Sequence, residues 1–227
     1  MIITPTPYSK KLLEGYGINK EIRVLSNGID LKRFCYDENK IDKFRNAFSL
    51  KEDDLVVLSV GLYFERKGIL DFIEVAKNMP HVKFIWFGYT PLYAIPKKIR
   101  YAIKNHPQNV IFPGYVKGDI LEGAYLDTNC FFFPSYEETE GIVVLEALAS
   151  LQVVLVRDIP VYNPWLVNQV NCFKGMNNHD FINQIDSILN HEFIDLKDKG
   201  REIAKQRSLS IVGNELKSIY ETVLNKI

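Results

Sequence analysis

The chain has 227 residues, 47% of them hydrophobic and 25% charged, which is the composition of a folded globular protein with one large domain or two small ones. Its 28 Lys and Arg residues equal its 28 Asp and Glu residues in number. The chain therefore lacks the excess of basic residues that is typical of nucleic-acid-binding proteins. No apolar run reaches about 18 residues, and the first residues lack the basic start and apolar core of a signal peptide, so we expect a cytoplasmic protein.

The first 25 residues contain two short predicted strands with a helix between them. Residues 2–4 and 22–25 have the composition of strands, and residues 9–15 have a helical pattern that a glycine closes. The turn Ser26-Asn-Gly-Ile-Asp30 follows the second strand.

From residue 37 onward, helical and strand patterns alternate. The predicted helices are 37–48, 68–78, 96–104, 119–125, 142–149, 181–189, 195–206 and 208–224, and the predicted strands are 55–60, 82–87, 110–112, 131–133 and 153–156. The strand at 55–60 is almost continuously apolar, which indicates a sheet covered on both faces. We therefore predict an α/β fold with a doubly wound parallel sheet.

Four candidate loops follow predicted strands directly, at residues 61–67, 87–88, 114–115 and 135–141. Because ligands of such sheets bind beyond the carboxyl ends of the strands, we expect these loops to converge on one edge. After the strand at 153–156, we expect Arg157 and Asp158 to form a buried pair that fixes the next loop. The three cysteines and four histidines show no metal-ligand spacing.

The loop at 135–141 has the strongest signal for a ligand. It joins a buried aromatic strand to a helix rich in good helix formers, so unpaired amides and the positive end of the helix dipole meet there. The loop also carries carboxylates, which repel a bare phosphate but accept hydrogen bonds from sugar hydroxyls. Glu138 and Glu146 are separated by seven residues, and Glu146 lies roughly 7 Å along the helix. Acids near a helix start also complement its dipole without binding anything, and spacing alone does not separate the two interpretations.

The stretch Glu138-Thr-Glu-Gly-Ile-Val-Val-Leu-Glu146 resembles the Glu-x7-Glu motif of retaining glycosyltransferases of the GT-B fold, family 4. Further pieces agree in order and spacing: Ser26-Asn-Gly-Ile-Asp30, Ser59-Val-Gly61, Arg66-Lys-Gly68, Phe87-Gly88 and Ile111-Phe-Pro-Gly-Tyr115. The runs starting at Phe64, Phe84 and Val156 are most similar to bacterial 1,2-diacylglycerol 3-glucosyltransferases. The resemblance covers residues from about 22 to about 175.

The resemblance implies a Rossmann-like, nucleotide-sugar-binding C-terminal domain at residues 26–227. Residues 1–25 are then expected to be the remnant of an N-terminal acceptor domain and its linker. Residues 208–227 are expected to be a helix that crosses back to that domain, so part of its apolar stripe should be exposed. We expect such a fragment to be inactive by itself as a transferase.

The resemblance also assigns roles to residues. Glu138, Arg66 and Lys67 are the expected catalytic residues: Glu138 lies beside the transferred sugar, while Arg66 and Lys67 neutralise the leaving diphosphate. The expected donor-binding residues are Gly61 in the first loop, Glu146 at the ribose, the amides of Thr139, Glu140 and Gly141 at the hexose, the amides of Ile142 and Val143 at the phosphate, and Tyr115 and Val116 at the base. Relatives commonly carry an arginine where Leu62 stands and an aromatic residue where Glu140 stands, which leaves the first phosphate contact and the hexose contacts open.

The implied reaction transfers glucose or another hexose from a UDP-sugar to a lipid or glycan acceptor, with retention and without metal or other cofactor. Diacylglycerol, in glycolipid synthesis, fits the resemblance, and the full-length protein then associates with the inner face of the membrane. The implied partners include no nucleic acid. A non-catalytic nucleotide-sugar-binding module is the alternative function. A sugar-nucleotide epimerase of the same architecture is a weaker one, because its motif order is not found here.

Overall fold

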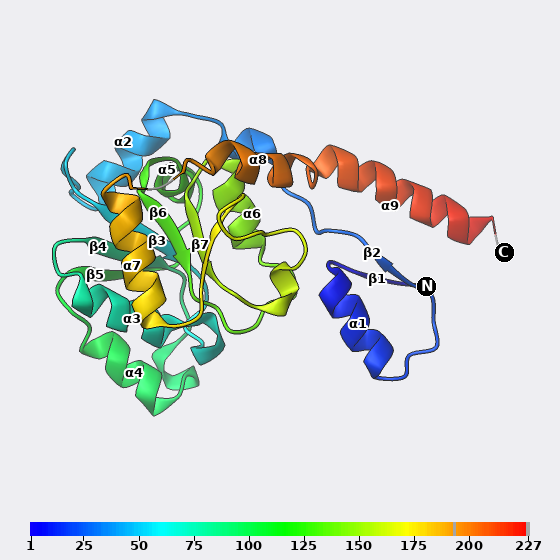
Figure 1. Ribbon diagram of the computed structural model, residues 1–227, viewed down its shortest axis with the longest axis horizontal. Helices are drawn as coiled ribbons and strands as arrows, with labels where there is room; N and C mark the ends of the chain where they lie inside the picture. Colours follow the sequence, from blue (N-terminus) through cyan, green and yellow to red (C-terminus); the bar gives the residue numbers. More distant parts are fainter. Residues whose placement is uncertain (193, 226–227) are drawn as a thin grey trace.

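The computed structural model describes residues 1–192 and 194–225. Its centre is a parallel six-stranded sheet with the order β5-β4-β3-β6-β7-β8 (Figure 1). The strands are β3 (Val56–Val60), β4 (Lys83–Phe87), β5 (Val110–Gly114), β6 (Cys130–Phe133), β7 (Val154–Arg157) and β8 (Phe173–Gly175). The chain winds outward from β3 in one direction and from β6 in the other, so the predicted doubly wound parallel sheet is confirmed.

Helices cover both faces of this sheet (Figure 1). They are α2 (Glu38–Ala47), α3 (Ile69–Asn78), α4 (Lys97–Lys104), α5 (Asp119–Asp127), α6 (Ile142–Ala149), α7 (Asn178–Leu189) and α8 (Lys197–Lys205). Successive strand residues point to opposite faces: Phe132 packs in one core with residues of α3, α4 and α7, and Phe131 and Phe133 pack in the other with residues of α2, α5, α6 and α8. This two-sided burial explains why the strands are almost continuously apolar.

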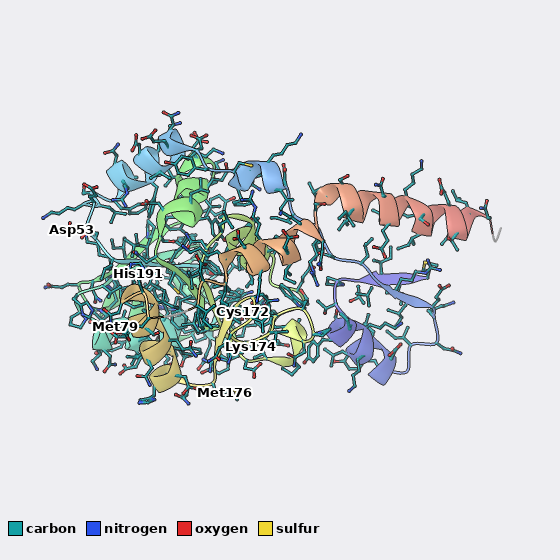
Figure 2. All side chains as sticks on the ribbon, turned by 45° about the horizontal axis from the view of Figure 1, so that its top comes forward. Asp53, Met79, Cys172, Lys174, Met176 and His191 are labelled. Carbon is teal, nitrogen blue, oxygen red and sulfur yellow. The ribbon has the colours of Figure 1, made fainter. Side chains whose placement is uncertain are left out.

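The predicted boundaries agree with the structure to within a few residues, and α6 begins and ends as predicted. Strand β8 was not predicted. It has three residues, of which Lys174 and Gly175 are unusual in a buried strand. The ammonium group of Lys174 (labelled in Figure 2) is buried against Asp158 Oδ1 at 3.0 Å and Asn163 Oδ1 at 3.1 Å, and these contacts compensate the cost of burying it.

The N-terminal segment forms a small unit of its own. Strands β1 (Ile2–Thr4) and β2 (Ile22–Val24) pair in parallel, and α1 (Pro7–Gly15) lies between them in the chain. Thr6 caps α1 by accepting from the Ser9 amide. Residues 25–30, called the linker below, then return to the sheet domain, where the Ile29 amide donates to Arg207 O at 2.9 Å.

Helix α9 (Leu209–Leu224) begins at this linker and extends away from the sheet domain (Figure 1). Of its apolar stripe, Leu209 and Tyr220 are more than half exposed, whereas Ile219 is buried. Partial exposure of the stripe is therefore confirmed, and the last two residues of the predicted range 208–227 lie outside the described residues. The division into domains stays a prediction.

The carboxyl edge of the sheet faces the N-terminal unit. Figure 2 labels Asp53, just before β3, at the end of the molecule away from α1, and Met176, just after β8, nearer to α1. The Thr6 hydroxyl donates to Thr139 O at 2.9 Å, so α1 and the loop after β6 are in contact.

Candidate functional site

Strands β3 and β6 are neighbours at the centre of the sheet, and from them the chain continues to opposite edges of the sheet. The loops that follow β3 and β6 lie next to each other at the carboxyl ends of these strands. The Tyr136 amide donates to Arg66 O at 2.7 Å, and Ser135 Oγ lies 3.0 Å from the same oxygen. The loop after β3 is tied to that after β4, because the Gly61 amide donates to Phe87 O at 2.8 Å. The Gly88 amide donates to Gly114 O at 2.8 Å, so the four candidate loops do share one edge.

Helix α6 starts without a side-chain cap. Gly141 occupies the Ncap position with φ of 86°, a conformation that favours glycine. A Cβ there would lie 3.2 Å from the ring of Tyr162 and 3.3 Å from its hydroxyl. Among the described residues, the amides from Thr139 to Val143 donate no hydrogen bond to the protein. The positive end of the helix dipole therefore presents free donors at the edge of the sheet.

Glu138 lies at one side of these amides and is held by two donors. Its Oε1 accepts from Lys67 Nζ at 2.5 Å and from Ser135 Oγ at 2.7 Å. The side chains of Glu138 and Lys67 are only 7% and 14% exposed, so the pair is largely shielded from solvent. Lys67 thus lies between the loops after β3 and β6, and in this structure its charge is neutralised by Glu138.

Glu146 lies about one turn into α6. Its Oε2 accepts from the Tyr125 hydroxyl at 2.9 Å, and no described residue donates to its Oε1. Burial raises the pKa of Glu146 above its ordinary value, although the Tyr125 hydrogen bond and the Arg33 charge act in the opposite direction. Burial, followed by the Glu146 charge, also raises the pKa of Tyr125, which keeps its hydroxyl a donor. Glu146 therefore has one fixed oxygen and one available oxygen.

A cavity of about 350 Å³ brings the predicted catalytic residues together. Arg66, Lys67 and Glu138 line it, with Glu137 and Thr139 from the same loop. The opposite wall comes from α1, through Tyr8, Ser9 and Leu12. These three residues were not predicted as site residues, because only the contact between segments about 130 residues apart in the chain reveals them.

Arg66 is more exposed than Lys67. Its Nη1 donates to Glu137 O at 3.2 Å, and its guanidinium lies 5.8 Å from the centre of the Phe64 ring. It therefore reaches the rim of the cavity without an ion pair to a described carboxylate.

The side chain of Glu140 points away from the cavity. It is 1% exposed, and its Oε2 accepts from the amide and the side-chain Nδ2 of Asn27 at 3.0 and 2.6 Å. Together with the Thr6 contact to Thr139 O, this bond ties the loop to the N-terminal unit and to the linker. The Glu140 carboxylate therefore has a structural role, whereas the Glu140 amide is one of the amides that donate no hydrogen bond to the described part of the protein.

Gly61 lies beside Lys67, because a Cβ at Gly61 would be 3.8 Å from Lys67 Cγ. Gly61 O accepts from Trp86 Nε1 at 2.8 Å, and a Cβ on the neighbouring Gly88 would lie 2.0 Å from the same oxygen, so glycine at position 88 allows the close approach of the two loops. Tyr115 is 76% exposed, and Val116 packs partly on the core. No described hydrogen bond joins either residue to Glu138 or Glu146.

The predicted pair between Arg157 and Asp158 is wrong. Arg157 Nη2 lies 3.3 Å from Asp71, and its guanidinium stacks on Tyr136 at 3.8 Å, whereas Asp158 pairs with Lys174. The two side chains diverge because successive strand residues point to opposite faces. Arg157 also donates to Pro134 O at 3.1 Å, so it fixes the start of the loop that carries Glu138.

Within residues 1–192 and 194–225, no group of three His, Cys, Asp or Glu side chains is arranged to hold a metal ion. None of the helices in this part of the chain is both long enough and apolar enough to cross a membrane.

Residues 40–207 match the sequence family described as "Glycosyl transferases group 1". The chain is 48% identical over 225 residues to a "Processive diacylglycerol alpha-glucosyltransferase" of Acholeplasma laidlawii, covering 99% of this chain and 68% of that protein. It is 28% identical over 182 residues to an "Alpha-galactosylglucosyldiacylglycerol synthase" of Streptococcus pneumoniae, covering 75% of this chain and 46% of that protein.

Solved structures show the same fold. The HepE protein of Anabaena in complex with UDP-glucose superposes with a TM-score of 0.87 at 17% identity, over 98% of this chain and 64% of that one. A sucrose-phosphate synthase from Thermosynechococcus elongatus gives 0.85 at 21% identity, over 99% and 58%. The chain thus spans between about half and two thirds of the length of these similar proteins, from 46% to 68%, and the predicted GT-B type of fold is confirmed.

Proposed function

The chain belongs to the glycosyl transferases of group 1, and from this premise we propose that it is the donor-binding part of a retaining hexosyltransferase. In this proposal residues 26–227 bind a UDP-sugar, and the hexose passes to an acceptor hydroxyl. The relative from A. laidlawii is named a diacylglycerol glucosyltransferase, which supports glucose as the hexose and a diacylglycerol-type lipid as the acceptor. A cytoplasmic protein at the inner face of the membrane follows from such an acceptor.

The observation that carries the proposal is the row of free amides at the start of α6, flanked by Glu138 and Glu146. A diphosphate needs hydrogen-bond donors and positive potential, which the amides and the helix dipole provide. A sugar on either side of it needs acceptors, which the two carboxylates provide. A nucleoside diphosphate sugar has this order of groups: sugar, diphosphate, sugar.

Glu146 is assigned to the ribose. The Tyr125 hydroxyl occupies Oε2 and fixes the carboxylate, while Oε1 is available to accept from the vicinal hydroxyls. The buried setting strengthens such a bond, because there is little water to compete with it.

Lys67 and Arg66 are assigned to the diphosphate. When the bond between the anomeric carbon and the diphosphate oxygen breaks, its electron pair stays on the diphosphate, and cations beside that oxygen stabilise the charge. The acceptor oxygen bonds to the anomeric carbon on the same face, and its proton passes to the departing diphosphate. Lys67 would exchange Glu138 for a phosphate oxygen, since the two anions compete for one ammonium group.

Glu138 and the free amides of Thr139, Glu140 and Gly141 are assigned to the hexose. Release of Lys67 leaves Glu138 with the Ser135 hydroxyl and with room to accept from sugar hydroxyls. The cavity wall from α1 then lies across from the transferred sugar, on the side from which an acceptor would approach.

Titration calorimetry of the chain with UDP-glucose, UDP and uridine tests the proposal. We expect UDP-glucose and UDP to bind with an affinity in the range of about 10 μM to 1 mM, and uridine to bind much more weakly because it lacks the diphosphate. The absence of heat and of a thermal shift with millimolar UDP-glucose would contradict the donor site. Binding that is retained in the full-length protein without hexose transfer to any lipid would instead identify a nucleotide-sugar-binding module.

A further inference from the structure

One part of the sequence departs from the overall charge balance. Residues 75–118 contain seven Lys and Arg residues and no Asp or Glu, although acidic residues make up 28 of the chain's 227 residues. This segment runs from α3 through β4, α4 and β5 to the loop after β5, and its four tyrosines are more than half exposed: Tyr89, Tyr93, Tyr101 and Tyr115. Lys77, Lys83 and Lys98 pair with acidic residues outside the segment, so the positive charge that is unpaired among the described residues is concentrated on α4 and at Lys117.

Helix α4 concentrates these residues on one surface. Its Ile99 and Ile103 are buried in the core, so Lys97, Tyr101 and Lys104, which follow each other at helical spacing, point to solvent. Lys98 and Arg100 flank this row, and Tyr93 is 85% exposed in the turn that leads into the helix. We call these six residues the α4 patch: Tyr93, Lys97, Lys98, Arg100, Tyr101 and Lys104.

The charges of the α4 patch are mostly uncompensated. Lys98 lies 3.2 Å from Glu65, and both side chains are exposed, so water screens this contact. No described carboxylate pairs with Lys97, Arg100 or Lys104. Figure 1 shows α4 on the outside of the sheet domain, with no other helix over its outer side. The helix thus offers positive charge to a partner outside this chain.

Lysines on the polar side of a surface helix, together with exposed tyrosines, are suited to a membrane surface with anionic headgroups. The ammonium groups attract anionic headgroups, and the tyrosine ring lies at the headgroup level with its hydroxyl in water. The patch also lies beside the functional edge, because α4 follows directly from the loop that begins at Gly88.

We propose that the α4 patch docks the sheet domain onto an anionic membrane surface, with phospholipid phosphates at Lys97, Lys98 and Lys104 and the rings of Tyr93 and Tyr101 among the headgroups. The inference rests on the proposed function, because a lipid acceptor is met at such a surface. Docking through α4 brings the edge with Glu138 and Lys67 to the membrane on the side where β4 and β5 end. The proposed occupant is lipid because the lysines complement anionic headgroups and the exposed tyrosine rings fit the headgroup level of a membrane.

The test is co-sedimentation of the chain with vesicles of phosphatidylcholine alone and with vesicles containing roughly one third phosphatidylglycerol. We expect binding to the anionic vesicles only, with a strong decrease on adding salt. The variant with Lys97→Gln, Lys98→Gln and Lys104→Gln should bind at least about tenfold more weakly, since each lysine near such a surface contributes about fivefold. The matched control with Lys199→Gln, Lys205→Gln and Lys217→Gln removes the same charge from α8 and α9 and should change binding less than about twofold.

A second pair of variants tests the tyrosines. Tyr93→Ser with Tyr101→Ser should weaken vesicle binding by about fivefold or more, whereas Tyr36→Ser with Tyr220→Ser, which removes two exposed tyrosines elsewhere, should not. Absent binding to anionic vesicles, equal losses in patch and control variants, or patch-dependent binding to RNA in place of vesicles would each overturn the inference. UDP binding is measured on the same variants to distinguish a failure of the membrane inference from a failure of the donor site. The α4 patch contains none of the residues assigned to the donor, so its variants should bind UDP as the unmodified chain does.

Discussion

Glu138 and Glu146 stand eight positions apart in the chain, yet the protein holds them in opposite ways. Glu138 is held by a cation, Lys67, and by the Ser135 hydroxyl, so its charge is neutralised within the site. Glu146 is held by the neutral hydroxyl of Tyr125, and burial raises its pKa. In the proposed donor site this difference is a division of labour: Glu146 is assigned as the acceptor for the ribose diol, and Glu138 holds the Lys67 ammonium group that we assign to the diphosphate.

The sharpest way to separate the two carboxylates is to remove each in turn. Glu146→Ala should weaken UDP binding by roughly 10- to 100-fold, the loss of a hydrogen bond to a charged group, because the ribose loses its acceptor. Glu138→Ala should change UDP affinity by less than about threefold, since UDP carries no hexose and Lys67 becomes free for the phosphates. Calorimetry measures both, with Glu137→Ala as the exposed control. Equal losses in the two variants would contradict the division.

Lys67→Ala tests the other half of the comparison. We expect UDP affinity to fall by about tenfold. This loss is smaller than for a lysine without an ion pair, because Lys67 gives up its contact with Glu138 when it binds the phosphate. Uridine affinity should not change, since uridine has no diphosphate. If uridine binding falls together with UDP binding, Lys67 supports the fold of the loop and not the ligand.

Tyr125→Phe removes the hydroxyl that fixes Glu146 and should weaken UDP-glucose binding by about fivefold at neutral pH. The ionised Glu146 carboxylate is the stronger acceptor for the ribose hydroxyls, so affinity is highest above its pKa and decreases as the pH falls through it. Because burial raises this pKa above 4.5, the loss should begin at a higher pH than for an ordinary glutamate.

Tyr125→Phe should also shift the pH dependence of UDP-glucose affinity in a defined direction. The Tyr125 hydrogen bond lowers the pKa of Glu146, so its removal should move the decline in affinity to higher pH. UDP-glucose is the ligand to use, because its diphosphate has no terminal phosphate that titrates near neutral pH. A profile that does not move would show that Glu146 is not the group that titrates.

Glu140 is a third carboxylate in the same loop, and it should affect donor affinity least. Glu140→Gln weakens the bonds from Asn27, so we expect a decrease of about 1 to 3 kcal/mol in the free energy of unfolding and less than a twofold change in UDP affinity. Denaturant unfolding and calorimetry on one sample measure both. A large loss of affinity without a loss of stability would move Glu140 from the structural to the ligand-binding residues.

Local signals in the sequence were sufficient for most of the fold. The limits of α6 were predicted because Gly141 and an unbroken apolar run mark them, and β3 because its residues are buried on both faces. Strand β8 was missed because its Lys174 is stabilised by Asp158 and Asn163, which lie outside any local window. The pairing of Arg157 failed for the same reason, since its partner Asp71 belongs to α3.

The site, like the fold, was predicted only where the signals are local in the sequence. The motif spacing placed Glu138, Glu146 and the α6 amides together, and the order of the loops placed Lys67 beside them. The sequence did not reveal that Lys67 pairs with Glu138, that Tyr125 fixes Glu146 or that α1 lines the cavity. Each of these contacts joins residues at least 21 positions apart, so it depends on the folded chain.

A crystal structure of the chain with UDP-glucose is the most direct test of the central claim, that the diphosphate lies on the α6 amides between Glu146 at the ribose and Glu138 at the hexose. The account predicts Glu146 Oε1 within about 3.2 Å of a ribose hydroxyl, phosphate oxygens at the amides of Ile142 and Val143, and the ammonium group of Lys67 moved from Glu138 to the diphosphate. A nucleotide bound elsewhere, or bound at this edge with Lys67 still on Glu138 and no contact to Glu146, would contradict it.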